Sequence, residues 1–137
     1  EDTAVSPFFL DLHEGELLFS NSGPAQIIQT QDQTLRVIAE QQTLGGSLSA
    51  TSRVDGLAWA PDGSIYLAFE ADGVYRLNNG NEQRVMGDGE HTSYNRDHGV
   101  GAEVNYYGRG GNSLTLGSDG SLYVSDFYNQ VIRIIDW

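Results

Sequence analysis

Apolar residues in this chain come in short runs, and the runs are separated by turns that contain glycine. The arrangement occurs three times, and Gly15, Gly63 and Gly120 mark the same place in the three copies. Each copy reads as a strand, a turn, a second strand, a loop and a third strand. No window keeps an apolar period of about 3.6 residues, so the sequence predicts an all-β fold with almost no helix.

Turn signals mark the second and third copies most clearly. Asp62-Gly63 and Asp119-Gly120 stand between alternating apolar runs, where glycine takes a positive φ without steric cost. A fourth strand follows in the first two copies, at Leu35–Ile38 and at Gln83–Met86. Each copy is one supersecondary unit that cannot bury its apolar face alone, so the copies must stack like the blades of a β-propeller. The predicted blades cover residues 8–39, 54–86 and 113–137.

The third copy resembles the NHL repeat. It reads DGSLYVSD at Asp119–Asp126 and NQVIRIID at Asn129–Asp136, against the usual D-G-x-[LI]-Y-V-[AS]-D and N-x-x-I-R-x-[IV]-D. The specific match covers residues 85–137, including a glycine-rich connector like that of bacterial NHL propellers. The second copy fits more loosely, because Phe69–Asp72 replaces the usual Asp-centred loop. The resemblance implies an NHL-type propeller, which usually has about six blades, and this chain encodes three.

The predicted third blade stops at Trp137 without a fourth strand. Residues 2–6 have the right length for that strand and no other assignment, and an open sheet edge pairs with any available strand. We therefore expect a homodimer by strand exchange, in which two chains close one six-bladed ring and each lends residues 2–6 to the other. The alternative is that these 137 residues belong to a longer chain with further blades.

Composition narrows the function classes. The chain has 137 residues, enough for one domain with a modest core, and a net charge of −12 that repels phosphate backbones and anionic lipids. We therefore expect neither nucleic-acid binding nor membrane binding, and no apolar run reaches the roughly 20 residues that span a bilayer. Lysine and cysteine are both absent, which excludes a Schiff-base lysine, a Walker-type phosphate loop and thiol chemistry. The lack of cysteine favours a location outside the cell only slightly.

The long connector Gly87–Asn112 is the strongest candidate for a ligand-contacting segment. It is rich in glycine and also holds histidines, tyrosines and arginines. Glycine lets a backbone approach a ligand closely, tyrosine offers flat amphipathic area, and arginine offers a fork for carboxylates. The alternative is that the connector only packs over the seam between two blades. The candidate ligand-binding residues, including two in a neighbouring loop, are His91, Tyr94, Arg96, Asp97, His98, Tyr106, Tyr107, Arg109, Phe127 and Tyr128.

Calcium and zinc are the two metals to consider. Gluconolactonase-like and paraoxonase-like propellers, which are related to this fold, hold a channel calcium and hydrolyse lactones or esters. On the residues alone, Asp126 is better explained as an acceptor of backbone N–H bonds at its own turn. A zinc site of His13, His91 and His98 has poor spacing, because His13 lies in a different hairpin. The candidate calcium ligands, at equivalent ends of two predicted blades, are Glu70, Asp72, Asp126 and Asn129.

Three functions fit this pattern. No Gly-x-Ser-x-Gly nucleophile motif occurs, and one sequence cannot pair carboxylates across a site. We therefore expect a non-catalytic module that binds a protein, peptide or glycan. The first alternative is a calcium-dependent hydrolase or lactonase, or a lyase, of the propeller type, and the second is a structural scaffold that assembles with itself. The fold alone does not choose, because propellers serve all three purposes.

Overall fold

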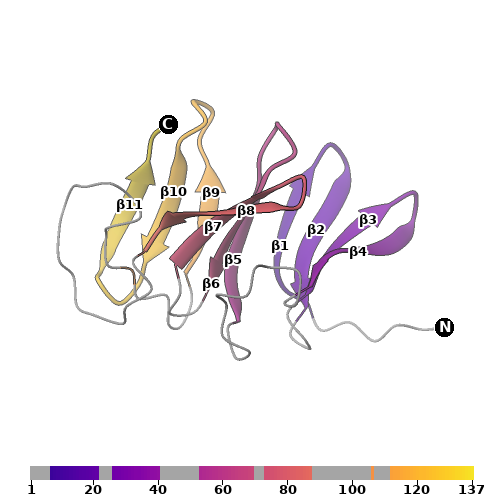
Figure 1. Ribbon diagram of the computed structural model, residues 1–137, viewed down its shortest axis with the longest axis horizontal. Helices are drawn as coiled ribbons and strands as arrows, with labels where there is room; N and C mark the ends of the chain where they lie inside the picture. The colour runs from indigo at the N-terminus through magenta and orange to yellow at the C-terminus, as the bar shows by residue number, and fades with distance from the viewer. Residues whose placement is uncertain (1–6, 22–25, 41–52, 70–72, 88–105, 107–111) are drawn as a thin grey trace.

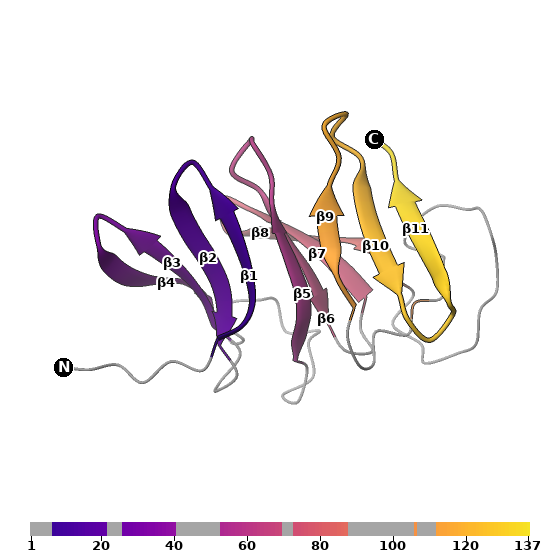
Figure 2. The same cartoon turned by 180° about the vertical axis from the view of Figure 1, so that it is seen from behind.

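The computed structural model describes residues 7–21, 26–40, 53–69, 73–87, 106 and 112–137. In this part of the chain the fold is all-β: eleven strands form three antiparallel sheets, and no helix occurs. These residues accordingly contain no helix that could cross a membrane. The sheets lie side by side in chain order (Figure 1), and the view from behind shows the same row (Figure 2).

The first sheet is a meander in the order β1-β2-β3-β4. Glu14 and Gly15 have φ values of 50° and 85°, and Asp32 and Gln33 have values of 49° and 63°. Two successive residues with positive φ make the tight turn that matches the twist of paired strands, so both hairpins close in two residues. The strands of this sheet are β1 (Pro7–His13), β2 (Glu16–Asn21), β3 (Gln26–Gln31) and β4 (Thr34–Glu40).

The second sheet repeats this meander in the order β5-β6-β7-β8. The hairpin between its last two strands closes on Asn79 and Gly80, which both have positive φ. The fourth strands that the sequence predicted in the first two copies are therefore present, as β4 and β8. The strands of this sheet are β5 (Val54–Trp59), β6 (Ile65–Phe69), β7 (Gly73–Asn78) and β8 (Asn81–Met86).

The third sheet has three strands among the described residues, in the order β11-β10-β9. The first hairpin of this sheet has the same turn hydrogen bond as the first hairpin of the second sheet. The Ser64 N–H donates to Asp62 Oδ1 at 2.9 Å, and the Ser121 N–H donates to Asp119 Oδ1 at 3.1 Å. The strand predicted from residues 2–6 lies outside the described residues. The strands of this sheet are β9 (Leu114–Leu116), β10 (Leu122–Asp126) and β11 (Val131–Ile135).

The first and second sheets pack against each other mainly through β1 and β5. The Trp59 N–H donates to Asp11 Oδ2 across the two sheets at 2.7 Å. The ring of His13 lies 5.3 Å from the ring of Trp59, so this histidine packs against an aromatic side chain. We call this contact the first seam, and its buried apolar residues are Leu18, Ile27, Ala39, Val54, Leu57, Ile65, Leu67, Phe69 and Tyr75.

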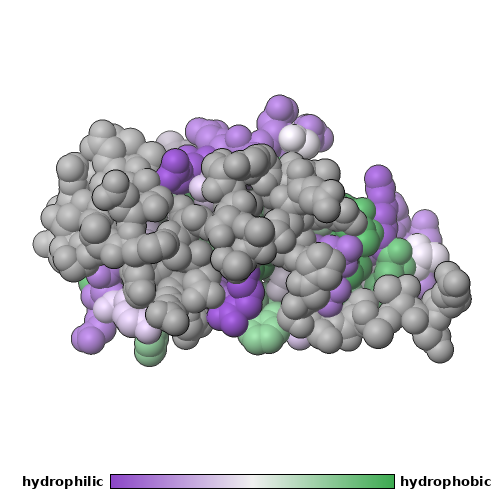
Figure 3. Space-filling model, turned by 60° about the horizontal axis from the view of Figure 1, so that its bottom comes forward, coloured by the Kyte–Doolittle hydropathy of each residue, from purple (hydrophilic) through white to green (hydrophobic). Residues whose placement is uncertain are grey.

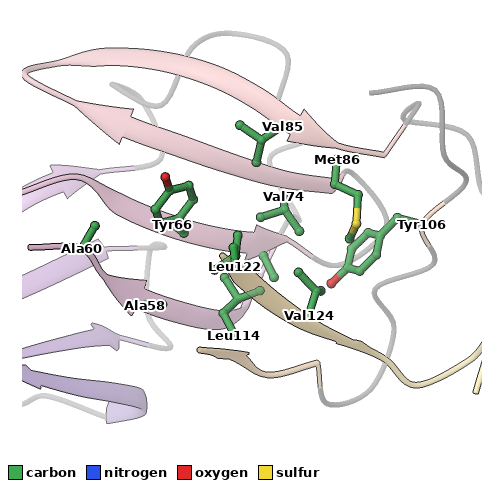
Figure 4. Packing of buried hydrophobic residues seen from close by; sticks show 11 residues of the cluster. Ala58, Ala60, Tyr66, Val74, Val85, Met86, Tyr106, Leu114, Leu122 and Val124 are labelled. Atoms are coloured by element: carbon green, nitrogen blue, oxygen red, sulfur yellow. The ribbon is translucent and has the colours of Figure 1, made fainter. Parts of the chain in front are cut away.

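The second and third sheets pack against each other through β5 and β6 on one side and β9 on the other. We call this contact the second seam. Figure 4 shows its side chains converging between the strands of the two sheets. The C-terminal Trp137 adds a contact at one end, where its ring stacks on that of Tyr66 at 5.7 Å. The buried apolar residues of the second seam are Ala58, Ala60, Tyr66, Ala68, Val74, Val85, Met86, Tyr106, Leu114, Leu122 and Val124.

The middle sheet is therefore buried on both sides. All five residues of β6 are buried. Side chains alternate across a strand, so Ile65, Leu67 and Phe69 point into the first seam, while Tyr66 and Ala68 point into the second. A strand with two covered sides needs a continuous apolar run, which is what the sequence has here.

Candidate functional site

The sequence predicted that Tyr106 contacts a ligand. The structure instead places Tyr106 in the second seam. Its side chain is 1 % exposed and packs near Met86 and Val124 (Figure 4). Burial, and to a smaller extent the negative charges of Asp126 and Asp55, raise the pKa of the Tyr106 hydroxyl. The large apolar area of the ring explains this position, because burying it stabilises the fold.

Phe127 and Tyr128 form an exposed aromatic pair on the loop between β10 and β11. The two residues are 62 % and 52 % exposed, and their rings lie 5.8 Å apart in an edge-to-face arrangement. The Phe127 N–H donates to Asn112 Oδ1 at 3.2 Å, which ties this loop to the residues before β9. We call Phe127 and Tyr128 the aromatic pair, and its exposure is what surface contact with a ligand requires.

Asp126 is buried, and other residues of the protein already engage its carboxylate. Oδ2 accepts hydrogen bonds from Arg133 Nε and from Asn129 Nδ2, both at 2.8 Å. Oδ1 accepts a longer bond from the Asn129 N–H at 3.4 Å. Asn129 thus turns N–H groups toward the carboxylate. This geometry fits the interpretation that the sequence favoured for Asp126, as an acceptor that stabilises its own turn.

The remaining predicted site residues lie outside the part of the chain that the structure describes. Within the described residues, no three histidine, aspartate or glutamate side chains gather in a way that could hold a metal ion. The predicted residues without a described position are His91, Tyr94, Arg96, Asp97, His98, Tyr107 and Arg109 for the ligand, and Glu70 and Asp72 for calcium.

Exposed apolar side chains lie on the outward sides of the two end sheets, and the sequence pattern did not predict them. On the first sheet, Leu10 and Leu12 are 65 % and 66 % exposed, and on the third sheet, Ile132 and Ile134 are 73 % and 56 % exposed. Figure 3 shows hydrophobic surface at the end of the row that holds β1–β4. The repeat itself carried this signal, because within the chain the first and last copies each have a neighbour on one side only.

Two buried polar residues near the second seam were also missed. Asp55 in β5 is 1 % exposed, and Asn112, just before β9, is fully buried. They occupy equivalent positions of the second and third copies when Gly63 is aligned with Gly120. Arg53 Nε donates to Asp55 Oδ1 at 2.8 Å. A polar residue repeated at the first strand of two copies was the available signal in the sequence.

A polar hollow of about 340 Å³ lies beside the hairpin between β7 and β8. Arg76 at its wall donates to Asp62 Oδ2 at 2.7 Å and to Ser64 Oγ at 3.0 Å. The hydrogen bond from the Ser64 N–H, more than the Arg76 charge, lowers the pKa of the Asp62 carboxyl. The hollow offers amide and guanidinium groups without a nucleophile or an apolar floor, so we assign no reaction to it. Its lining residues are Arg76, Asn78, Asn79, Asn81 and Gln83.

Comparison with known proteins supports the fold alone. No protein-family model matches the sequence, and no curated protein matches it significantly. The chain is similar in structure to a crystal structure of a protein of unknown function from Bacteroides thetaiotaomicron VPI-5482, with a TM-score of 0.67 and 14 % sequence identity. The similarity covers 88 % of this chain and 32 % of that protein. The chain thus spans about a third of the length of that neighbour, and the comparison is consistent with a β-propeller-like fold.

Proposed function

We propose that this chain is part of an NHL-like β-propeller and acts as a non-catalytic interaction module. The observation that carries the proposal is the apolar outward side of each end sheet, where Leu10, Leu12, Ile132 and Ile134 are exposed. Apolar surface of this kind is stabilised when another element covers it. Inside the chain, the same kind of surface is covered by a neighbouring sheet, so a further sheet is the natural cover at both ends.

The outward side of the first sheet corresponds to the side that packs on a preceding sheet in the other two copies. Leu67 of the second sheet points into the first seam, and Val124, its equivalent in the third copy, points into the second. The equivalent residue in the first sheet is Phe19, when Gly15 is aligned with Gly63. Phe19 pairs with Leu10 in the strand register, so both residues lie on the outward side, where Phe19 is buried and Leu10 is exposed.

The outward side of the third sheet is the complementary one. Tyr66 points from the second sheet toward the third. Its equivalent in the third copy, Tyr123, pairs with the exposed Ile134 on the outward side. A contact between the third sheet of one chain and the first sheet of another therefore repeats the geometry of the internal seams. Two such contacts close a ring of two chains.

Strand exchange completes this proposed homodimer. The edge strand β11 has a neighbour on one side only among the described residues, where it pairs with β10. Residues 2–6 of the partner chain add a fourth strand at this edge, as β4 and β8 do in the other sheets. The alternative is that further sheets of a longer polypeptide cover both ends, and the mass of the assembly in solution separates the two.

The aromatic pair supports a binding role for the assembled ring. Phe127 and Tyr128 offer rigid amphipathic area on a loop held by the sheet, which suits a protein, peptide or glycan. A ring of two chains presents two such pairs, so a ligand with two binding elements gains affinity through avidity. The net charge of −12 favours neutral or basic ligands over anionic ones.

The test is the mass of the isolated chain by size-exclusion chromatography with light scattering. At micromolar concentration we expect twice the 15.0 kDa of one chain. Ile134→Arg places a charge on the outward side of the third sheet and is expected to give a monomer. Phe127→Arg is the matched control, because it also adds a charge at an exposed apolar residue but lies off that side. It should leave the dimer intact and weaken only ligand binding. A wild-type chain that stays soluble and monomeric at these concentrations contradicts the two-chain ring.

A further inference from the structure

Three buried polar groups near the second seam have an atom that lacks a hydrogen-bond partner among the described residues. These atoms are Asp55 Oδ2, Asn112 Nδ2 and the Tyr106 hydroxyl oxygen. Each of the three residues is 1 % exposed or less. Buried polar atoms in folded proteins nearly always have a partner, because an unpaired one destabilises the fold. Three such atoms in one region therefore indicate a bound molecule.

The backbone brings these residues together. Asp55 lies near the start of β5 and Asn112 just before β9, and these two strands are in contact. At Gly56, the next residue after Asp55, an added Cβ would lie 3.0 Å from the Asn112 carbonyl oxygen. Tyr106 is buried in the second seam near Val124 (Figure 4), where burial and then the charges of Asp126 and Asp55 raise the pKa of its hydroxyl. The three residues with unpaired atoms thus lie in one region between the second and third sheets.

The hydrogen bonds already present determine what kind of molecule fits. Asn112 Oδ1 accepts the Phe127 N–H, so the unpaired atom of this amide is a donor. Asp55 Oδ1 accepts from Arg53, so its second oxygen remains as an acceptor. The missing partner must therefore accept one hydrogen bond and donate another. A metal cation cannot accept from an amide N–H, and an anion is repelled by the carboxylate, whereas a neutral hydroxyl group does both.

We propose that Asp55, Asn112 and Tyr106 form a binding site for one internal water molecule between the second and third sheets. The water accepts from Asn112 Nδ2, donates to Asp55 Oδ2 and has a further bond available for the Tyr106 hydroxyl. Buried waters typically make about three such bonds to groups that are otherwise unpaired. Because Asn112 also holds the Phe127 N–H, the water fixes the amide that positions the loop of the aromatic pair. This inference does not depend on ring closure or on a ligand.

A crystal structure of the wild-type chain tests the site directly. We expect one peak of electron density at about 2.7–3.2 Å from both Asp55 Oδ2 and Asn112 Nδ2. Three results overturn the proposal: a protein group bonded to these atoms, no density between them, or an ion with oxygen ligands at about 2.3–2.6 Å, as for calcium. Crystals grown with calcium and examined for its anomalous scattering separate a water from that ion.

The melting temperature of Tyr106→Phe gives an independent test in solution. If the Tyr106 hydroxyl bonds to the water, its removal loses that bond and lowers the melting temperature by about 2–6 °C. If the hydroxyl is truly unpaired, its removal relieves a buried polar group and raises the melting temperature, which overturns this part of the proposal, as does an unchanged value. Tyr66→Phe is the matched control, because Tyr66 belongs to the same cluster but lies at its other end (Figure 4). Its change should be smaller than that of Tyr106→Phe.

Discussion

The middle sheet and the two end sheets have similar repeats but very different exposure. Every residue of β6 in the middle sheet is buried, whereas β11 in the third sheet alternates between half-buried and exposed residues. Leu67 in the middle sheet is fully buried, while Ile134 in the third sheet is 56 % exposed. The side of the third sheet that holds Ile134 has no neighbouring sheet among the described residues, whereas both sides of the middle sheet are covered. The exposed apolar sides of the end sheets are the same surfaces that the middle sheet uses for packing.

The middle and third sheets also differ in the side chains that occupy one pair of equivalent positions. Phe69 and Tyr75 form an edge-to-face pair at 5.6 Å in the middle sheet. The strand register places Asp126 and Arg133 at the same positions in the third sheet, where they form an ion pair at 2.8 Å. Both pairs are largely buried and join the second and third strands of their sheets. One position in the fold thus accepts either an apolar or an ionic pair, provided that both members match.

Arg133→Met should cause the largest loss of stability among these tests. It leaves the fully buried carboxylate of Asp126 without its cation, and breaking such a pair costs about 3–5 kcal/mol. The measurement is the free energy of unfolding in urea.

The control for this prediction copies the Phe69–Tyr75 pair of the middle sheet into the third sheet. The double variant Asp126→Phe with Arg133→Tyr should recover most of the lost stability, because a matched apolar pair has no buried charge to satisfy. If Arg133→Met costs less than about 1 kcal/mol, the pair behaves like an exposed one and the contrast between the two sheets disappears.

Leu67→Ala and Ile134→Ala compare the middle and third sheets directly. Leu67→Ala removes a fully buried side chain and should lower the free energy of unfolding by about 3 kcal/mol at any protein concentration. In a single chain, Ile134→Ala should change it by less than about 0.5 kcal/mol. In a ring of two chains, the effect of Ile134→Ala should instead grow with protein concentration. Urea titrations at several concentrations distinguish these cases, and an effect of Ile134→Ala that is large at all concentrations would contradict the exposure seen in the structure.

The sequence predicted the strands well because its signals are local. Asp-Gly turns and alternating apolar residues depend on only a few neighbours, and the hairpins at Gly63 and Gly120 have the same hydrogen bonds in the structure. Exposure is a different matter, because it depends on which sheets are neighbours. The sequence therefore could not tell that Leu10 is exposed while Leu67 is buried, although both lie in apolar strands.

It was also harder to predict which residues of two sheets take the same place in the strand register than to predict the strands themselves. Arg76 and Arg133 look equivalent in the sequence when Gly63 is aligned with Gly120. The connection from β10 to β11 is, however, one residue longer than the connection from β6 to β7. This extra residue shifts the register, so Arg133 takes the position of Tyr75 and reaches Asp126. Arg76 points instead to the hairpin turn and pairs with Asp62.

Tyr106 shows why the candidate site was only partly predictable. In the sequence, Tyr106 has the same features as its neighbour Tyr107, and a long glycine-rich connector favours surface contact. Its burial depends on the second seam, which forms between residues far apart in the chain. Phe127 and Tyr128 follow a strand that ends in a turn, and both are exposed in the structure.

Glu82 gives the test with the smallest expected change in stability. It is a partly buried carboxyl group in the middle sheet. It lies half-buried in β8, and its Oε2 has no hydrogen-bond partner among the described residues. Burial raises the pKa of Glu82 above its ordinary value of 4.5. A raised pKa means that the folded state favours the protonated form, so the stability from this group is present below pH 4.5 and is lost as the pH rises through the folded-state pKa.

Glu82→Gln should therefore raise the melting temperature at pH 7 by about 1–3 °C, and this gain should vanish below pH 4.5. The side chain is partly exposed, so water reduces the effect and keeps it small. Glu14→Gln, at an exposed turn residue of the first sheet, is the matched control and should change the melting temperature little at either pH. A gain at pH 7 that persists unchanged at pH 4 would show that the carboxylate charge is not the cause. The middle sheet would then tolerate this carboxylate as readily as the exposed edges of its neighbours do.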